Sequence, residues 1–383
     1  MRAVGLFAGI GGIELGLGRA GWTTELLCEI DPPARSVLRA HFPGVHLTAD
    51  VRKIRSLPQA DLVAAGFPCQ DLSQAGMTAG IRGSRSGLVN EVFRLVATRR
   101  AAPTWLLIEN VSFMLHLDRG RAMAHLTDTL GKLGYFWAYR VVDTRAFGLP
   151  QRRQRVILLA SRTDDPRPVI LGTEAVTNEA TDSTDRACGF YWTEGLRGLG
   201  WAIDAVPTLK GGSTVGIPSP PGIWMPDGSI QAPEIRDAER LQGFPANWTG
   251  PAVEGESRKN GPRWRLVGNA VSVPVAEWIG QRLKRSYGPY RSRDRLLEAD
   301  SPWPKAAWGR DGQAHAASVD MWPVRRRYKH LSDFLRYPTT PLSKRALEGF
   351  LSRTRRSSLR FPEGLIESVE DALGLGANED EVA

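Results

Sequence analysis

Short apolar runs alternate with amphipathic stretches along the first part of the chain, up to about residue 165. Several of these runs have the length of buried strands, namely residues 62–65, 105–108 and 156–160. Helical spacing predicts one helix at residues 13–20, ended by Gly21 as a C-cap, and another at residues 33–41. Because strands that alternate with helices build a sheet covered on both faces, the pattern predicts a doubly wound α/β domain.

The pattern changes after about residue 164, where the periodicity gives way to Thr, Gly, Pro and Trp residues. Stretches rich in Gly and Pro, at residues 211–213 and 218–222, are typical of loops between short strands. Helical spacing returns at residues 235–241 and 273–283, and we expect the second of these helices to pack on the first domain. We therefore predict a first domain at 1–164, a smaller loop-rich domain at 165–260 and a return to the first domain at 261–286.

The remaining residues, 287–383, are expected to form a basic C-terminal extension whose role the sequence does not reveal. The extension carries the run Arg325-Arg326-Arg327-Tyr328-Lys329, which either a solvated surface or a set of phosphate contacts would explain. Within the same stretch, Leu347, Phe350 and Leu351 have the spacing of a helix with one buried face.

The net charge and the number and spacing of the cysteines limit the classes of protein to which the chain can belong. Lys and Arg total 50 against 41 Asp and Glu, a net charge of +9 that favours a polyanionic partner. Cys28, Cys69 and Cys188 are odd in number and far apart, so neither a disulfide framework nor a metal site is indicated. A cytoplasmic protein is expected, because no apolar run approaches the ~20 residues that span a bilayer and a core strand begins at Ala3 or Val4.

A glycine-rich turn near the N-terminus is a candidate cofactor site. Gly9, Gly11 and Gly12 lie between a predicted strand and a helix, where the backbone can approach a nucleotide-like group closely. A purely structural turn would explain these glycines equally well. The cofactor interpretation is favoured by Glu29, which can bind ribose hydroxyls, and by Asp50, which can accept a hydrogen bond from an adenine amino group.

A second candidate site combines a thiol, an acid and two arginines. Cys69 lies on a Gly/Pro-bounded turn after the run at residues 62–65 and can act as a nucleophile, whereas Cys28 and Cys188 are expected to be buried and inert. Glu109 follows the run at residues 105–108, and a carboxylic acid in a dry pocket can donate or share a proton.

Two arginines near the start of the next predicted strand complete this set. Arg153 and Arg155 alternate there, and a guanidinium can hold a base oxygen and the carboxylate of Glu109 together. A solvated basic turn is the alternative interpretation of the run at residues 151–155.

These segments, in this order, resemble the C5-cytosine DNA methyltransferase family over about residues 3–283, together with elements at 207–213, 236–248 and 265–271. The resemblance implies a Rossmann-like domain that binds S-adenosyl-L-methionine and transfers its methyl group to C5 of cytosine in a specific duplex DNA sequence. It also implies that Cys69 adds to C6 of a flipped-out cytosine, Glu109 neutralises charge at N3, Arg155 contacts the base and Arg153 supports Arg155.

The same resemblance implies binding residues and a target-recognition role for residues 165–260. The cofactor pocket is expected to be lined by Phe7, Gly9, Gly11, Gly12, Glu29, Ile30, Asp50, Val51, Pro68, Leu88 and Asn269. A lid at residues 70–87 and the recognition domain are expected to contact DNA through Gln70, Ser73, Arg82, Arg85, Thr208 and Leu209. The family usually has Asp where this chain has Gly5, a departure that bears on a supporting hydrogen bond and not on the pocket itself.

The resemblance implies double-stranded DNA as substrate, and we expect a monomer. The sequence leaves open whether the protein works with a cognate restriction endonuclease or as an orphan or phage enzyme. Three other classes were weighed against this interpretation. An RNA cytosine methyltransferase on the same fold would carry a Cys-Phe-Thr element that the recognition region lacks. A catalytically dead DNA-binding regulator would not need Cys69, Glu109 and Arg155, and a small-molecule methyltransferase would need neither the Cys69 turn nor a second basic domain.

Overall fold

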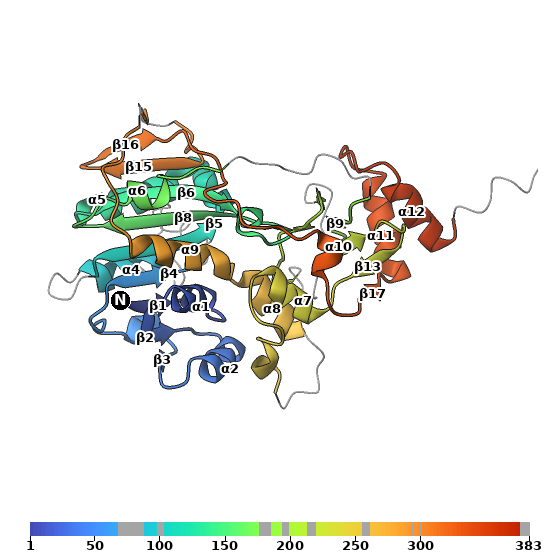
Figure 1. Ribbon diagram of the computed structural model, residues 1–383, viewed down its shortest axis with the longest axis horizontal. Helices are drawn as coiled ribbons and strands as arrows, with labels where there is room; N and C mark the ends of the chain where they lie inside the picture. The colour runs from blue at the N-terminus through green and yellow to red at the C-terminus, as the bar shows by residue number, and fades with distance from the viewer. Residues whose placement is uncertain are drawn as a thin grey trace, which may run out of the picture. The chain divides into compact units, whose positions relative to one another are not determined.

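The structure, a computed structural model, describes residues 1–67, 88–97, 103–175, 185–193, 199–212, 220–254, 261–292, 294–298 and 301–375. The chain divides into two compact units, each described here by itself (Figure 1). Unit 1 comprises Met1–Phe147, Gln154–Val176 and Ala270–Arg325, and unit 2 comprises Gly148–Arg153, Thr177–Asn269 and Arg326–Ala383.

Unit 1 is built on a ten-stranded sheet with the order β14-β16-β15-β6-β8-β5-β4-β1-β2-β3. Its parallel half consists of β1 (Arg2–Leu6), β2 (Thr23–Cys28), β3 (His46–Thr48), β4 (Leu62–Ala65) and β5 (Trp105–Val111). The antiparallel half consists of β6 (Phe136–Asp143), β8 (Gln154–Ser161), β14 (Arg295–Leu296), β15 (Ala306–Arg310) and β16 (Gln313–Ala316). The predicted α/β fold is confirmed, with antiparallel strands added at one side of the parallel sheet.

Helices cover both faces of this sheet (Figure 1). One face packs on α4 (Leu88–Ala97) and α5 (Arg121–Lys132), and the other on α1 (Gly12–Arg19) and α9 (Val273–Leu283). The further helices of unit 1 are α2 (Pro32–His41), α6 (Arg167–Ile170) and the 3-10 turns η1 (Val51–Lys53), η3 (Ser112–Leu115), η4 (Leu117–Gly120) and η5 (Thr144–Phe147). The predicted packing of the helix at residues 273–283 on the first domain is confirmed.

Unit 2 contains a small five-stranded sheet with the order β10-β9-β12-β13-β17. Its strands are β9 (Cys188–Phe190), β10 (Trp201–Ile203), β12 (Gly222–Trp224), β13 (Ile230–Ala232) and β17 (Thr340–Pro341), and all pairings are antiparallel. A separate parallel pair joins β7 (Gln151–Arg152) to β11 (Val206–Pro207). The helices are α7 (Ile235–Leu241), η6 (Gly250–Ala252), α8 (Gly261–Asn269), α10 (Leu331–Phe334), α11 (Lys344–Thr354) and α12 (Leu365–Leu373).

The C-terminal residues are part of both units, which differs from the separate extension expected at 287–383. In unit 1, β15 pairs along β6 and buries Ala306 and Ala307. In unit 2, β17 pairs with β13, and α11 packs Leu347, Phe350 and Leu351 into one core with Phe190 and Ile230. The predicted helix with one buried face is thus confirmed, and it lies inside a shared core.

Several elements extend beyond the apolar runs that predicted them. β5 continues to Val111 and therefore contains Glu109, and β8 begins at Gln154 and contains Arg155. Residues 261–269, expected only to return the chain to the first domain, form the helix α8. A run of apolar residues indicates only the buried part of a strand. The backbone hydrogen bonds between neighbouring strands continue through polar residues, so the strand is longer than the run.

We expect truncation after residue 290 to prevent folding, because it removes β15 from β6 and about half of the core of the small sheet. The matched control is truncation after residue 375, which removes only residues outside the described range. Soluble yield and thermal unfolding would be compared for both. A 1–290 protein that unfolds cooperatively at the temperature of the full chain would contradict this expectation.

Candidate active site

The candidate site of unit 1 lies at the carboxyl ends of the parallel strands. The strand order reverses between β1 and β4, because the chain from β1 continues to β2 and β3 on one side and to β4 and β5 on the other. Loops that leave the two sides of such a switch point diverge and open a crevice for a ligand. The segments that leave β1, β2 and β4 at this edge include Gly9, Glu29 and Phe67, and Glu109 lies near the end of β5.

The Glu29 carboxylate organises the glycine turn after β1. Its two oxygens accept hydrogen bonds from the backbone N–H of Gly9, at 2.7 Å, and of Asp31, at 2.8 Å. Burial raises the pKa of Glu29, and these backbone donors act in the opposite direction. Beside this carboxylate Gly9 has φ +56° and no heavy atom within 4 Å of the position a Cβ would take. An acid beside open backbone fits a nucleoside cofactor such as adenosylmethionine.

The remaining candidate cofactor residues have mixed surroundings. Ile30 is 65% exposed and offers an open apolar surface, whereas Val51 is buried in the core. Asp50 caps η1 and binds the side chain of Arg52, whose hydrogen bonds lower the pKa of Asp50. Phe7 is half-buried with φ 57°. Gly11 caps α1, Gly12 begins α1, and Leu88 begins α4. Asn269 is exposed at the end of α8 in unit 2, and Pro68 lies outside the described residues.

Glu109 and Arg155 form an ion pair across neighbouring strands. In the antiparallel register of β5 and β8, Val111 faces Arg155 and Glu109 faces Ile157. The side chains of Glu109 and Arg155 lie diagonally, with Arg155 Nε 3.1 Å from Glu109 Oε1, and are only 11% and 14% exposed. The structure therefore brings together two of the four predicted catalytic residues.

Asn110 connects this pair to the segment that leads into the Cys69 turn. Its side-chain Nδ2 donates to the carbonyl of Phe67 at 3.0 Å, and its Oδ1 accepts from the N–H of Val111. A Cβ at Gly66 would lie 3.8 Å from Glu109 Oε2 and 3.9 Å from the carbonyl oxygen of Phe7. The end of β4, Glu109 and the cofactor turn thus border one small space. Cys69, Gln70, Ser73, Arg82 and Arg85 lie outside the described residues.

The two other cysteines are poor nucleophiles. Burial, followed by the charges of Glu29 and Asp50, raises the pKa of Cys28 to about 12. Burial likewise raises the pKa of Cys188 to about 11. The predicted burial of both thiols is confirmed, and their raised pKa values favour the protonated form at neutral pH.

Arg153 belongs to unit 2, whereas Arg155 belongs to unit 1. The guanidinium of Arg153 is buried and donates from Nη1 to the carbonyls of Leu209, at 3.1 Å, and Gly268, at 3.2 Å. Gln151 is also buried, accepts from the N–H of Leu209 and donates to the carbonyl of Leu241. These two side chains therefore join three segments that were singled out separately in the sequence.

The two recognition-loop candidates differ in accessibility. The side chain of Leu209 is 2% exposed and packs with Val206 and Ile235. Thr208 is half-buried, and its hydroxyl donates to the carbonyl of Arg152 at 2.9 Å. The backbone of this loop is consequently fixed on both sides of Thr208.

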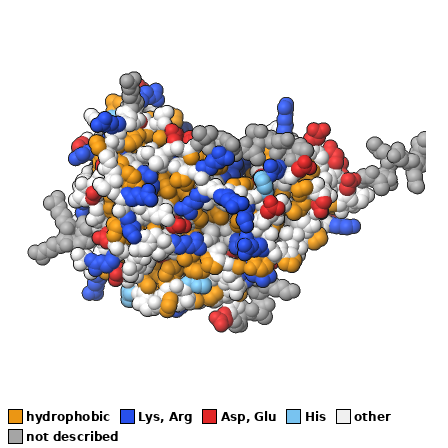
Figure 2. Space-filling view, in the orientation of Figure 1, with side chains coloured by type: hydrophobic (Ala, Val, Ile, Leu, Met, Phe, Trp, Pro, Cys, Tyr) orange, Lys and Arg blue, Asp and Glu red, His pale blue; other side chains and the backbone are white. Residues whose placement is uncertain are grey.

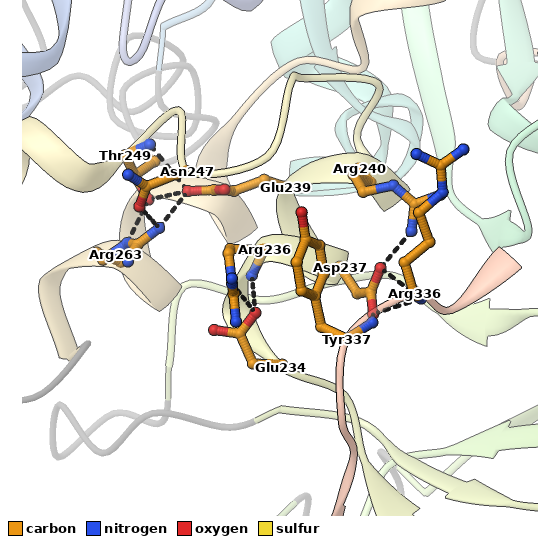
Figure 3. Close-up of polar contacts among 10 residues, drawn as sticks. All are labelled: Glu234, Arg236, Asp237, Glu239, Arg240, Asn247, Thr249, Arg263, Arg336 and Tyr337. Atoms are coloured by element: carbon orange, nitrogen blue, oxygen red, sulfur yellow. Dashed lines mark hydrogen bonds and ion pairs between the residues drawn. The ribbon is translucent and has the colours of Figure 1, made fainter.

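Helix α7 carries a buried network that sequence reasoning found only in part (Figure 3). Asp237 is fully buried, pairs with Arg240 and accepts from the backbone N–H of Arg336, at 3.0 Å, and Tyr337, at 2.9 Å. Its spacing to Arg240 is that of an ordinary surface pair, so no sequence pattern indicates its burial. The contacts with Arg336 and Tyr337 fix the C-terminal segment within unit 2.

A second buried acid of α7 points to the opposite side. Glu239 is fully buried and accepts from the N–H of Thr249, at 2.8 Å, and from Arg263, at 2.8 Å (Figure 3). Glu239 lies in the element at residues 236–248 that resembles the family. Its contacts with Thr249 and with α8 hold this part of unit 2 together.

Positively charged side chains are numerous on the surface. Lys and Arg side chains are numerous on the face drawn in Figure 2, whereas Asp and Glu gather over the part that carries α11 and α12. Arg325, Arg327 and Lys329 of the basic run are exposed. Across the described ranges, no helix has the length and apolar character needed to cross a bilayer, and no group of three or more His, Cys, Asp or Glu could hold a metal ion.

Comparison with known proteins points to one family. The model for C-5 cytosine-specific DNA methylase matches residues 1–188. The chain is 52% identical over 380 residues to Type II methyltransferase M2.BsuMI of Bacillus subtilis (strain 168), covering 97% of each chain. It is 28% identical to Type II methyltransferase M.NlaX of Neisseria lactamica, covering 76% of this chain and 99% of the relative. The structure of S. pombe Dnmt2 methyltransferase shares the fold, with a TM-score of 0.55 and 18% identity over 74% of this chain and 98% of that one.

We expect Asp237→Ala to destabilise the protein by about 3–5 kcal/mol, because it leaves the partly buried Arg240 without its carboxylate partner and two backbone N–H groups without their acceptor. Glu234→Ala, at the partly exposed N-cap of the same helix, is the matched control and should cost about 1 kcal/mol. Urea unfolding of the three proteins measures the difference. Equal losses for both variants would contradict the role given to Asp237.

Proposed function

The chain belongs to the C-5 cytosine-specific DNA methylase family, and from that membership we propose that it methylates C5 of cytosine in a specific duplex DNA sequence through a covalent adduct on Cys69. It is a DNA (cytosine-5-)-methyltransferase, and family membership implies dependence on S-adenosylmethionine. The observation that most supports the proposed mechanism is the Glu109–Arg155 ion pair, next to the segment that leads into the Cys69 turn.

Cys69 solves the main chemical difficulty of the reaction. C5 of cytosine is a poor nucleophile, because the ring is aromatic and neutral. Addition of the Cys69 thiolate to C6 breaks the aromaticity and places electron density on C5, so one difficult step becomes several easier ones. After methyl transfer, removal of the C5 proton expels the thiolate and restores the ring.

Glu109 and Arg155 neutralise the charge that reaches the ring. Glu109 is 8% exposed, so its carboxyl group can share a proton with N3 of the base with little competition from water. Arg155 holds Glu109 in place and has further N–H donors for the base oxygen O2. The buried contacts of Arg153 give it a supporting role through the backbone of Leu209 and Gly268.

The cofactor site is assigned to the glycine turn. Glu29 would bind the ribose hydroxyls, the open backbone at Gly9 would accept close approach of the cofactor, and Asp50 and Ile30 would contact the adenine. Adenosylmethionine, when bound there, supplies the methyl group. Because Asp50 is engaged by Arg52, adenine binding would need to share or displace that contact.

The base has to leave the duplex to reach this site. We assign to residues 70–87 the role of a lid that closes over the flipped base, with Gln70, Ser73, Arg82 and Arg85 as its DNA contacts. Thr208 and the backbone at Leu209 would contact DNA from the recognition unit. The protein is proposed to act as a cytoplasmic monomer beside a cognate restriction endonuclease.

Target recognition is assigned to unit 2 as a whole. Residues 177–269 and 326–375 share one sheet and one core there, and the carboxylate of Asp237 holds the backbone of Arg336 and Tyr337. The recognition domain predicted at 165–260 is therefore proposed to be incomplete without the C-terminal segment.

A covalent adduct can be trapped with DNA that carries 5-fluorocytosine at the target position. Fluorine cannot leave C5 as a cation, so release fails after addition and methylation. We expect a complex that survives denaturing electrophoresis only when adenosylmethionine is present, with the base on the peptide that contains Cys69. Cys69→Ala should form no complex and Cys188→Ala, whose thiol is buried, should form it normally.

A chimera tests the extent of the recognition unit. We expect exchange of residues 177–269 together with 326–383, from a relative that spans both segments and methylates another sequence, to transfer that specificity. Exchange of 177–269 alone should reduce stability and activity, because it mismatches the shared core. Bisulfite sequencing maps the methylated sites. An active chimera with the new specificity after exchange of 177–269 alone would show that the C-terminal segment is not needed.

A further inference from the structure

Glu14 is a buried acid that the mechanism above does not use. It is the third residue of α1, is 2% exposed, and its carboxyl group lies over β1 at Gly5. A Cβ on Gly5 would lie 2.0 Å from Glu14 Oε1, so the carboxyl group fills the space that a side chain at position 5 would need. Gly5 and Glu14 therefore form a complementary pair.

Among the described residues, the carboxyl group of Glu14 has no cation beside it, and its Oε2 is buried without a hydrogen-bond partner. Burial raises the pKa of Glu14 to about 7, the backbone N–H of Glu14 acts in the opposite direction, and the charge of Glu29 adds to the rise. A buried carboxylate is costly unless a partner neutralises it.

The elements around Glu14 offer no such partner. β1 and β4 have no titratable side chain near Gly5, and the chain after β2 contributes a second acid, Glu29. On α9, which packs against α1, the charged residues are Glu277 and Arg282, and Arg282 donates to the carbonyls of Val169 and Pro168. The charge that acts on Glu14 is thus that of a second acid, Glu29.

The position of Glu14 is at the cofactor edge of the sheet. Gly5 is the last but one residue of β1, directly before the turn whose Gly9 N–H is held by Glu29. The family usually has Asp at position 5, so this chain keeps an acid at the same place but supplies it from α1. An unpartnered buried acid at this edge matches a ligand that brings positive charge.

We propose that Glu14 is a cofactor-binding residue whose carboxylate is the counter-ion of a cationic group of adenosylmethionine. The inference rests on the proposed cofactor site. Adenosylmethionine carries an ammonium and a sulfonium cation, and either would supply the missing partner. Adenosylhomocysteine has the ammonium group but not the sulfonium charge, so the two ligands tell the cations apart.

The proposal requires that binding releases a proton near neutral pH. Burial raises the pKa of Glu14 to about 7, so the free protein keeps part of its Glu14 protonated near neutral pH, and a bound cation favours the charged form. Affinity for adenosylmethionine should therefore rise as the pH increases from 6 to 8.

Calorimetry in two buffers of different ionisation enthalpy measures the protons released on binding. We expect release of about half a proton at pH 7 from the unmodified protein. Glu14→Gln should abolish this release and weaken binding about tenfold or more. The cofactor's own amine titrates at about pH 8, and subtraction of the Glu14→Gln data removes its contribution.

Two further variants separate binding from folding. Glu25→Gln, a partly exposed acid on β2, is the matched control and should behave as the unmodified protein. Gly5→Asp alone should be disrupted by overlap with Glu14, whereas Gly5→Asp combined with Glu14→Ala should recover affinity and proton release. If Glu14→Gln fails to fold, the double variant still tests the proposal, because it should bind the cofactor and release a proton only if an acid at this place serves the bound cation.

Each outcome has a separate meaning. Release with both ligands assigns Glu14 to the ammonium group, and release with adenosylmethionine alone assigns it to the sulfonium. Tight binding with no release at pH 7, or release that Glu14→Gln does not change, would overturn the proposal for Glu14. Absence of any adenosylmethionine binding by the folded protein would instead overturn the proposed cofactor site.

Discussion

Buried carboxylates that accept backbone N–H groups are the interaction on which both units depend. Glu29 holds the glycine turn, Asp204 binds the N–H of Leu331, Asp237 binds Arg336 and Tyr337, and Glu239 binds Thr249. A carboxylate in a poorly hydrated interior has to be matched by strong donors, and backbone N–H groups in loops need an acceptor. These acids therefore fix loops, and in the case of Asp204 the start of α10, and the fixed segments carry the proposed site of unit 1 and the connections within unit 2.

The sequence predicted the bounds of helices and strands best where hydrophobic periodicity coincides with a buried face. α7 and α9 have the predicted bounds, and β4 matches its apolar run, because these elements present a continuous buried face. The pairing of Glu109 with Arg155 could be expected from their motifs, but its geometry depends on the antiparallel register of β5 and β8. That register is set by the long hydrogen-bonded pairings of β8 with β5 and with β6, and no short sequence motif encodes these pairings.

The sequence was least informative where distant segments meet through single hydrogen bonds. Asp237 resembles a surface acid paired with Arg240, and its decisive partners are backbone groups of Arg336 and Tyr337, which carry no side-chain signal. The same applies to β17, a strand of two residues that completes the small sheet. The C-terminal stretch was therefore expected to be separate, although its apolar residues fill a core begun by Phe190 and Ile230.

Glu14 is an exception to the rule that a buried carboxylate is matched by hydrogen-bond donors of the protein. The other buried acids discussed above bind donors of the protein, whereas Glu14 Oε2 has none in the described part of the chain. Because its pKa rises from 4.5 to about 7 on folding, the folded protein keeps a proton that the unfolded chain has lost, and the contribution of Glu14 to stability decreases as the pH rises between these values. A cation bound beside Glu14 reverses this effect, since it stabilises the charged form that burial disfavours. If the proposed cofactor occupies the glycine turn, part of the stability of unit 1 therefore depends on that ligand through Glu14.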